Sequence, residues 1–199
     1  SRTLVVHNVV TNNVRGSGIH LSQGCADVTL LANIIGANDE GIEIEKATNT
    51  TIRANRIYSS KYYGLNLTAA ENLTVVDNYL NNTANILTPS SAFSGTWNLS
   101  ARPGKNVVGN ALIGGNYWGT PSGTGFSDVT PDRDADGFVD GMFVLPGGIG
   151  TDSLPLGPSL SSPTGAMAAM PAVTIDTSTF QAESNPVVVD SGVEGTSIS

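Results

Sequence analysis

The sequence predicts an all-β protein: a right-handed parallel β-helix of about five coils, closed by an aromatic and acidic cap and followed by a β-prone tail. Two observations lead to this fold class, namely a repeat of about 23 residues and an apolar–polar–apolar alternation inside the repeats. A third observation disfavours a leucine-rich repeat, because the joining segments are rich in Asn, Thr, Gly and Ser and show no helical periodicity.

Asparagine marks the repeat. The anchor residues lie 25, 22, 23 and 32 positions apart and are Asn8, Asn33, Asn55, Asn78 and Asn110. Aliphatic residues stand three positions before and two positions after every anchor. Because asparagine tolerates the left-handed backbone conformation, we expect each anchor to adopt it at a corner, and to bond to the anchors of the neighbouring coils in an amide ladder.

Three glycine-led phrases carry the strand alternation, and their glycines are 23 residues apart: Gly18–Leu21, Gly41–Ile44 and Gly64–Leu67. We expect these glycines at corner positions that need a positive φ or close packing. In the fourth coil, residues 84–95 are interpreted as a loop insertion of about nine residues, after which Trp97–Leu99 take the place of the phrase.

The chain divides into coils (1–113), a C-terminal cap (114–157), and a linker and tail (158–199). An open end of a β-helix exposes unpaired strand edges, and the cap segment contains aromatic residues large enough to cover one: Tyr117, Trp118, Phe126, Phe138 and Phe143. The tail contains two β-prone runs, AVTID and NPVVVDSG. They would form an edge strand of this domain, the start of a further domain, or a strand given to a neighbouring chain.

An acidic loop lies inside the cap segment. Its carboxylates alternate along the chain around Gly137 and are Asp132, Asp134, Asp136 and Asp140. This spacing matches the first half of an EF-hand-type loop, but Phe143 stands where the bidentate glutamate would be. The pattern resembles the linkers of thrombospondin type 3 repeats. We therefore predict a structural calcium ion at these four residues, with a solvated acidic turn as the alternative.

Composition limits the partners. The net charge is −8 and the isoelectric point about 4.5, which argues against nucleic acid and against an anionic membrane surface. No apolar run reaches the length of a membrane-spanning segment. A single cysteine, Cys25, permits no internal disulfide.

Several features predict a secreted glycoprotein. Five Asn-x-Ser/Thr sequons are candidate glycosylation sites: Asn49, Asn66, Asn72, Asn81 and Asn98. No signal peptide is present, and residue 4 is already inside a repeat. The chain is therefore interpreted as a processed mature form or a fragment.

The asparagine coils, the stretch GGNYWGTPSGTGFSD, the acidic Asp-Gly loop and the stretch TDSLPL together resemble the NosD-like right-handed β-helix proteins of archaeal cell surfaces, of methanogens especially. The resemblance covers about residues 1–157, and the part from Asn-Tyr-Trp-Gly to Leu-Pro-Leu is its most specific portion. It implies a parallel β-helix, secretion and a place in the cell envelope. The family also contains relatives of carbohydrate-acting enzymes, so the fold leaves the function open.

No catalytic constellation stands out, and the sequence leans against an enzyme. Four charged residues could line a cleft but are more simply a solvated surface: Glu43, Glu45, Lys46 and Arg56. Three aromatic residues could stack on sugar rings but are more simply corner packing: Tyr62, Tyr63 and Trp97. His7 and His20 are expected on different sides of a coil, where they make a poor copper or zinc site.

Two functions of different classes remain. The first is a structural protein of the extracellular cell envelope, a sheath, surface-layer or filament subunit that assembles with copies of itself through the β-helix ends and the tail strands. The alternative is a secreted β-helix protein that binds or cleaves a carbohydrate, such as a cell-wall glycan.

Overall fold

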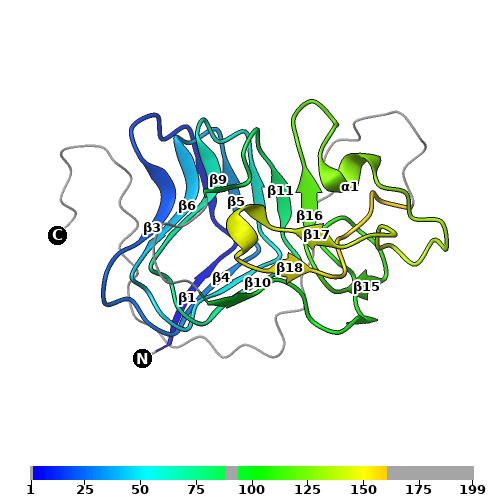
Figure 1. The fold of residues 1–199 in the computed structure, drawn as a ribbon. Coiled ribbons are helices and arrows are strands. Elements are labelled where there is room, and N and C mark those ends of the chain that lie inside the picture. Colours follow the sequence, from blue (N-terminus) through cyan, green and yellow to red (C-terminus); the bar gives the residue numbers. More distant parts are fainter. Residues whose placement is uncertain (1, 88–93, 161–199) are drawn as a thin grey trace.

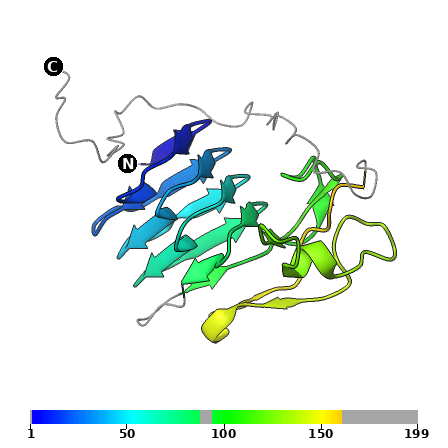
Figure 2. The same ribbon diagram turned by 90° about the horizontal axis from the view of Figure 1, so that it is seen from above.

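The computed structural model describes residues 2–87 and 94–160. In this part the chain winds into a parallel β-helix, and its strands stack from the N-terminal end (blue) toward the cap (yellow) (Figure 1). The view from above shows the coils lying side by side (Figure 2). The predicted all-β class and the parallel solenoid are confirmed, since the described part contains a single short α-helix, α1 (Phe126–Val129), and it lies in the cap.

Three parallel sheets form the walls of the solenoid. Sheet A contains β1 (Thr3–Val6), β4 (Val28–Leu31), β7 (Thr51–Arg53), β10 (Leu73–Val76) and β13 (Gly95–Thr96). Sheet B contains β2 (Val9–Thr11), β5 (Ile34–Gly36), β8 (Arg56–Tyr58), β11 (Tyr79–Asn81) and β16 (Tyr117–Gly119). Sheet C contains β3 (Ser17–Leu21), β6 (Glu40–Glu45), β9 (Tyr63–Thr68) and β12 (Ile86–Leu87). The described solenoid thus has four complete coils and part of a fifth.

Short elements outside the three sheets build the cap. β14 (Arg102–Pro103) and β15 (Leu112–Ile113) form an antiparallel pair in an excursion of the chain between β13 and β16. β17 (Phe143–Val144) and β18 (Thr151–Asp152) form a second antiparallel pair, with a 3₁₀ turn at Pro146–Gly148 between them. The last solenoid strand, β16, therefore lies inside the segment that the sequence assigned to the cap.

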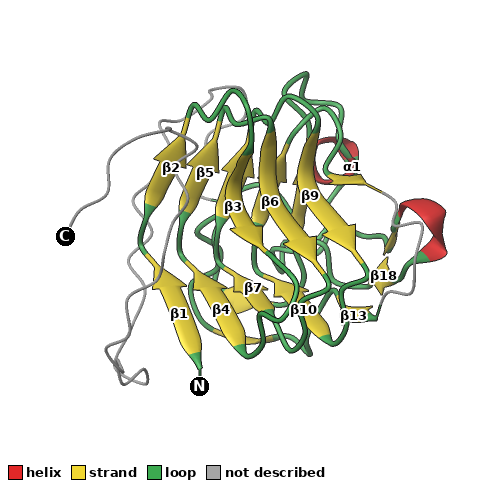
Figure 3. Cartoon of the chain, turned by 90° about the vertical axis from the view of Figure 1, so that its left-hand side faces the viewer, coloured by secondary structure: helices red, strands yellow, loops and turns green. Residues whose placement is uncertain are grey.

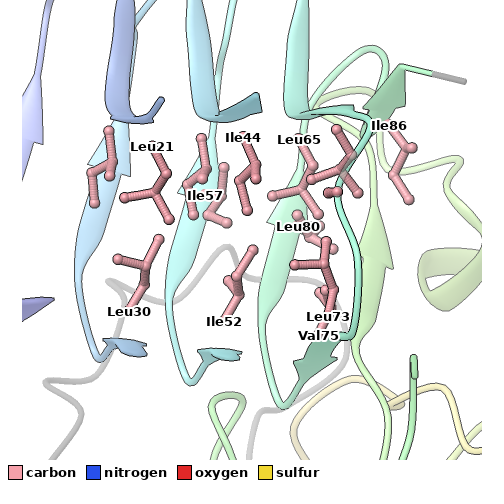
Figure 4. Packing of buried hydrophobic residues seen from close by; sticks show 14 of the residues in the cluster. Leu21, Leu30, Ile44, Ile52, Ile57, Leu65, Leu73, Val75, Leu80 and Ile86 are labelled. Atoms are coloured by element: carbon pink, nitrogen blue, oxygen red, sulfur yellow. The ribbon is translucent and has the colours of Figure 1, made fainter. Parts of the chain in front are cut away.

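Aliphatic side chains at equal register positions form the core (Figure 4). The column of sheet A is Val5, Leu30, Ile52 and Val75. The column of sheet B is Val10, Ile35, Ile57, Leu80 and Trp118. Sheet C has two inward columns, and the longer of the two is Ile19, Ile42, Leu65 and Ile86. In the second and third coils these side chains have no exposed surface, and each such burial contributes about 1.5–3 kcal/mol.

The corners between sheets A and B differ from the prediction. The anchor asparagines were expected to adopt the left-handed conformation, and this is wrong. The left-handed residue is the one before each of the first four anchors, with φ between 55° and 57°: His7, Ala32, Ala54 and Asp77. Such a backbone costs about 1–2 kcal/mol at a non-glycine residue, so each corner needs a compensating interaction.

A buried ladder of asparagine amides supplies that compensation. The backbone N–H and the Nδ2 of Asn33 both donate to Oδ1 of Asn55 at 2.9 Å. Asn55 donates to Asn78 in the same way at 3.0 Å, and Asn8 donates to Asn33 at 2.9 and 3.0 Å. The second Nδ2 hydrogen of Asn55 reaches the carbonyl oxygen of Leu30 at 2.9 Å. Each rung therefore fixes the spacing and register of two coils.

The fifth rung is Asn116 and not the predicted Asn110. The backbone N–H and Nδ2 of Asn78 donate to Oδ1 of Asn116 at 3.1 and 3.0 Å, across 38 residues. Asn110 lies in the excursion, where its side chain bonds to the backbone of Pro158 and Leu160. The prediction failed because the excursion lies between the fourth and fifth rungs and lengthens their spacing.

The fourth coil also differs from the prediction. Ile86 and Leu87 continue sheet C by pairing with Leu65 and Asn66, so the interpreted insertion at 84–95 begins with a strand. Residues 88–93 of that insertion lie outside the described residues. Trp97 does not replace the glycine-led phrase of sheet C, because it follows β13 of sheet A and is 2% exposed in the core.

The repeated glycines are explained by close packing. None of Gly18, Gly41 and Gly64 has a positive φ. A Cβ on Gly18 would lie 2.8 Å from the carbonyl oxygen of Gly41, and a Cβ on Gly41 would collide with the carbonyl oxygen of Gly64. Neighbouring coils approach too closely here for any side chain.

Aromatic rings cover the C-terminal end of the core. Trp118 stacks on Phe143 at 4.6 Å between ring centroids and lies 6.0 Å from Trp97. Phe126 of α1 packs against Phe143 at 5.3 Å. The other two aromatic residues of the predicted cap lie in a separate cluster and are Tyr117 and Phe138. The tail runs AVTID and NPVVVDSG lie outside the described residues.

The ladder predicts a position-dependent cost of removing an amide. Asn55→Ala should lower the free energy of unfolding by about 3–5 kcal/mol, because it leaves the donors of Asn33 and the carbonyl of Leu30 buried and unpaired, at about 1–3 kcal/mol each. Asn8→Ala, at the half-buried end rung, should cost about 1 kcal/mol. Urea denaturation followed by circular dichroism measures both values, and equal losses would contradict the ladder.

Candidate functional site

The acidic loop of the cap brings carboxylates together. Asp132, Asp134 and Asp136 each place one oxygen within 4.8 Å of the others, and they are the only such group of His, Cys, Asp or Glu among the described residues. Positive φ values at Ala135 (56°) and Gly137 (95°) turn the loop. The alternating carboxylates therefore converge, as their spacing predicts.

Backbone N–H groups hold two of these carboxylates. Oδ1 of Asp132 accepts from the N–H of Asp136 at 3.2 Å, and its Oδ2 accepts from Gly137 at 2.9 Å. Oδ1 of Asp136 accepts from Phe138 at 2.8 Å. Partial burial and the neighbouring Asp134 and Asp136 raise the pKa of the Asp132 carboxyl, and the backbone donors oppose this. Negative charge is thus only partly compensated within the loop.

Asp140 lies outside the group. Its Oδ2 lies 3.1 Å from Nη1 of Arg133 and also accepts from the backbone N–H of Arg133 at 3.2 Å. The structure therefore brings three of the four predicted ligands together and pairs the fourth with an arginine.

Two of the five sequon asparagines are exposed at the corner between sheets C and A. Nδ2 of Asn72 donates to Oδ1 of Asn49 at 2.7 Å, and Nδ2 of Asn49 donates to Asp27 at 3.1 Å. These two amides lie on successive coils, so glycans on both would be neighbours.

The other three sequon asparagines are half-buried. Nδ2 of Asn66 donates to Glu40 at 2.9 Å, and Nδ2 of Asn81 donates to the hydroxyl of Tyr79 at 2.8 Å. Oδ1 of Asn98 accepts from a backbone N–H of the cap at 3.1 Å. Attachment of a glycan would compete with these contacts at Asn66 and Asn81.

Two buried charged residues, each bonded to the backbone of Val107, fasten the excursion to the solenoid. The N–H of Val107 donates to Oδ1 of Asp77 at 2.8 Å, and its carbonyl oxygen accepts from Nη2 of Arg56 at 2.6 Å. Arg56 is 5% exposed and lies 5.3 Å over the ring of Tyr79. Burial lowers the pKa of Arg56 and raises that of Asp77 to about 6, the latter against Arg53 and the backbone donor.

Arg56 therefore does not belong to a cleft with the three other charged residues named by the sequence. Its side chain leaves the outer side of sheet B, whereas Glu43 and Glu45 leave sheet C. The exposed Lys46 pairs with Glu45 at 3.8 Å. The interpretation of these residues as one face is wrong, because the corner between the two sheets separates them.

The candidate sugar-stacking rings are also dispersed. Trp97 is buried in the core. Tyr62 is 50% exposed, but Nζ of Lys61 lies 4.6 Å over its ring. Tyr63 belongs to sheet C, where it is half-buried beside Glu40.

Asp152 is a buried carboxylate of structural importance that the sequence did not reveal. It has no exposed surface, and its Oδ2 accepts from the N–H of Asn116 at 2.7 Å and from Nε1 of Trp118 at 2.9 Å. Burial raises its pKa to about 6, although these donors oppose the shift. Its carboxylate occupies the place of the next rung and so terminates the ladder. The only signal in the sequence was its position in the stretch TDSLPL.

The potential soft ligands are scattered. His7 lies in the corner between β1 and β2, and the exposed His20 lies on sheet C, as expected. The partly buried Cys25 follows β3, and Met142 lies in the cap next to β17.

The buried carboxyl of Asp77 predicts a pH effect. Its folded pKa of about 6 exceeds the unfolded value of about 3.9, so the folded protein binds the proton more tightly. The free energy of unfolding should therefore rise as the pH falls from about 7 to about 5, and this gain should end near pH 4. Asp77→Asn, which can still accept from Val107, should reduce the slope in urea denaturation to the part that Asp152 contributes, because burial raises the pKa of Asp152 to about 6 as well. The exposed Glu71→Gln should retain it, and equal slopes for Asp77→Asn and wild type would contradict the prediction.

No helix in the described part is long and apolar enough to cross a membrane. In comparisons with known proteins, no curated protein and no solved structure matched the chain. A family model described as "Periplasmic copper-binding protein (NosD)" matches residues 1–123. The described residues of this range contain the strands of sheets A, B and C, β16 included, and the asparagine ladder. Since this match spans more than half of the chain, the protein belongs to the NosD family.

Proposed function

We propose that the protein is a secreted structural component of the cell envelope that assembles with copies of itself through the ends of its β-helix. The observation that supports this proposal is a set of unpaired strand edges at one end of the described β-helix. Within the described residues β1, β2 and β3 each pair on one side only, so the first coil presents three parallel strand edges. Such edges are templates for another chain.

Exposed apolar side chains lie near the two ends. Val9 and Val14 of the first coil are 70% and 71% exposed. In the cap, Val129, Met142 and Val144 are 63%, 64% and 65% exposed. A contact between the first coil of one copy and the cap of the next is heterologous, and it repeats into a filament or layer.

The proposed location of the protein rests on the description of its family. The family description calls its members periplasmic, which places them outside the cytoplasm. A cell-surface site, an archaeal source and glycosylation at the five sequons are parts of our proposal. Peptide mass spectrometry of the native protein reads out the occupancy of those sequons.

The described residues do not fit the copper that the family description names. Copper is bound in proteins mainly by imidazole and by thiolate or thioether sulfur. His7, His20, Cys25 and Met142 lie apart, and the one described group with metal-ligand geometry contains carboxylates only. We assign no role to copper among the described residues.

We also propose a structural calcium ion in the acidic loop. Oxygen ligands at alternate positions are the donors that calcium prefers, and the loop places Asp132, Asp134 and Asp136 together. Asp140 would become the fourth ligand only by leaving Arg133. The ion would compensate the charge of the loop and brace the cap.

The assembly proposal predicts an effect of charge at either end. Val9→Lys and Met142→Lys should each reduce the sedimentation coefficient of the assembled protein and shorten any filaments seen by electron microscopy, because a charged side chain opposes burial at the contact. Tyr62→Lys, at an exposed site in the middle of the stack, is the matched control and should leave assembly intact. A monodisperse wild-type monomer at high concentration would overturn the proposal. If Val9→Lys alone impaired assembly, the filament would be replaced in our proposal by a closed dimer in which the first coils of two copies pair.

The calcium proposal predicts a gain in thermal stability. Calcium at about 100 times its dissociation constant should stabilise the fold by about 2.7 kcal/mol, which corresponds to about 5 °C or more in Tm for a domain of this size. Asp134→Asn should abolish the shift and leave the Tm in chelator equal or slightly higher, since loss of this carboxylate relieves repulsion with Asp132 and Asp136 and removes no hydrogen bond to the backbone of the loop. Equal Tm values of the wild type with calcium and with chelator would exclude the site.

A further inference from the structure

The outer face of sheet C is a row of hydrogen-bonding side chains. β3, β6 and β9 lie side by side there (Figure 3). Their outward positions in register are Ser17, Glu40 and Tyr63 in one row and His20, Glu43 and Asn66 in the next. Glu45 and Thr68 begin a third row. All of these positions are exposed or half-buried, so the face is accessible over three coils.

The outer faces of the other two sheets are different. On sheet A the outward Leu31 and Val76 are each 1% exposed. On sheet B the excursion covers Arg56, and Tyr117 is 8% exposed and stacks on Tyr79 at 5.0 Å. Sheet A also has an accessible row of threonines, Thr51, Thr74 and Thr96. Among the three parallel sheets of the described solenoid, only sheet C has carboxylates within its strands.

Contacts between coils hold the two central glutamates in place. Oε2 of Glu43 accepts from the hydroxyl of Ser17 at 2.6 Å, toward the first coil. Oε2 of Glu40 accepts from Nδ2 of Asn66 at 2.9 Å, toward the third coil. An ionised carboxylate offers about four acceptor sites, so each glutamate keeps most of its acceptor capacity for a ligand.

The negative charges of Glu40 and Glu43 on this face have no basic partner among the described residues. Glu45 lies 3.8 Å from Lys46, but no ion pair in the described part joins Glu40 or Glu43 to a basic residue. The matching ligand carries positive charge and hydroxyl donors. An acidic polymer would be repelled by the two carboxylates.

We propose that the outer face of sheet C binds a glycan chain that carries amino groups. Glu40 and Glu43 receive ammonium groups, and the side chains of Ser17, His20 and Asn66 exchange hydrogen bonds with hydroxyls. Coils of this kind are spaced about 4.8 Å apart, so an extended polymer crossing the strands meets a new pair of outward side chains at each coil, with both carboxylates on the second coil. Tyr63 closes the row with an aromatic ring on the third coil. The inference concerns binding alone and does not depend on the assembly proposal.

The test is calorimetric titration of the full chain with glucosamine hexasaccharide at low salt. Binding should weaken about tenfold in the Glu40→Gln/Glu43→Gln double variant, as expected for two partly exposed charge pairs. It should also weaken with added salt. The N-acetylated hexasaccharide, which lacks the charge, should bind more weakly than glucosamine hexasaccharide, and a galacturonate hexasaccharide should not bind.

Glu71→Gln provides the matched control. Glu71 is exposed at the corner before β10 of sheet A, away from the outer face of sheet C. Glu71→Gln removes one negative charge, as each substitution of the double variant does, and should leave the affinity for glucosamine hexasaccharide unchanged. Thermal melting of each variant establishes that it is folded. The inference is overturned if the wild type binds none of the glycans at millimolar concentration, if the double variant binds as well as the wild type, or if galacturonate binds as tightly as glucosamine.

Discussion

The buried asparagine ladder is the interaction on which the rest of the structure depends. Each side-chain amide accepts two hydrogen bonds from one coil and donates to the backbone of that coil, so a single residue satisfies several groups that would otherwise be buried unpaired. That gain offsets the left-handed residue before each of the first four rungs, such as Ala54 with φ 55°. It also fixes the register that aligns the aliphatic columns and brings the backbones at Gly41 and Gly64 into contact.

The polarity of the ladder makes its two ends different. Every rung donates to the next rung toward the C-terminal end, and the last donors in this direction, on Asn116, meet the acceptor-only carboxylate of Asp152. An asparagine there would place a donor against Trp118 or against the N–H of Leu154, both of which donate to Asp152. The C-terminal end is therefore closed by chemistry as well as by aromatic rings. At the other end Asn8 donates inward, and the edges of its coil are unpaired within the described residues.

The repeat was predictable because burial acts on every coil in the same way. The columns through Leu30, Ile35 and Ile42 could be read from the sequence, and so could the aromatic cap and the converging aspartates. The corner conformation could not be predicted from the sequence. The side chain that forms the ladder and the backbone that adopts the left-handed conformation belong to adjacent residues. Asn116 and Asp152 could not be placed either, since each depends on how a non-repeating excursion folds back onto the stack.

The requirements of the core and the ladder distinguish positions that maintain the fold from positions that are free to carry a function. Inward positions must remain aliphatic and corner positions must serve the ladder, which leaves the outward positions free to differ between sheets. Sheet A buries its outward Leu31, and sheet B fastens the excursion through Arg56. Sheet C uses its outward positions for neither purpose, yet its glutamates are held by neighbouring coils through Ser17 and Asn66. These ordered carboxylates contribute nothing to the core and have no basic partner among the described residues, and this is the observation on which our proposal of a cationic ligand rests.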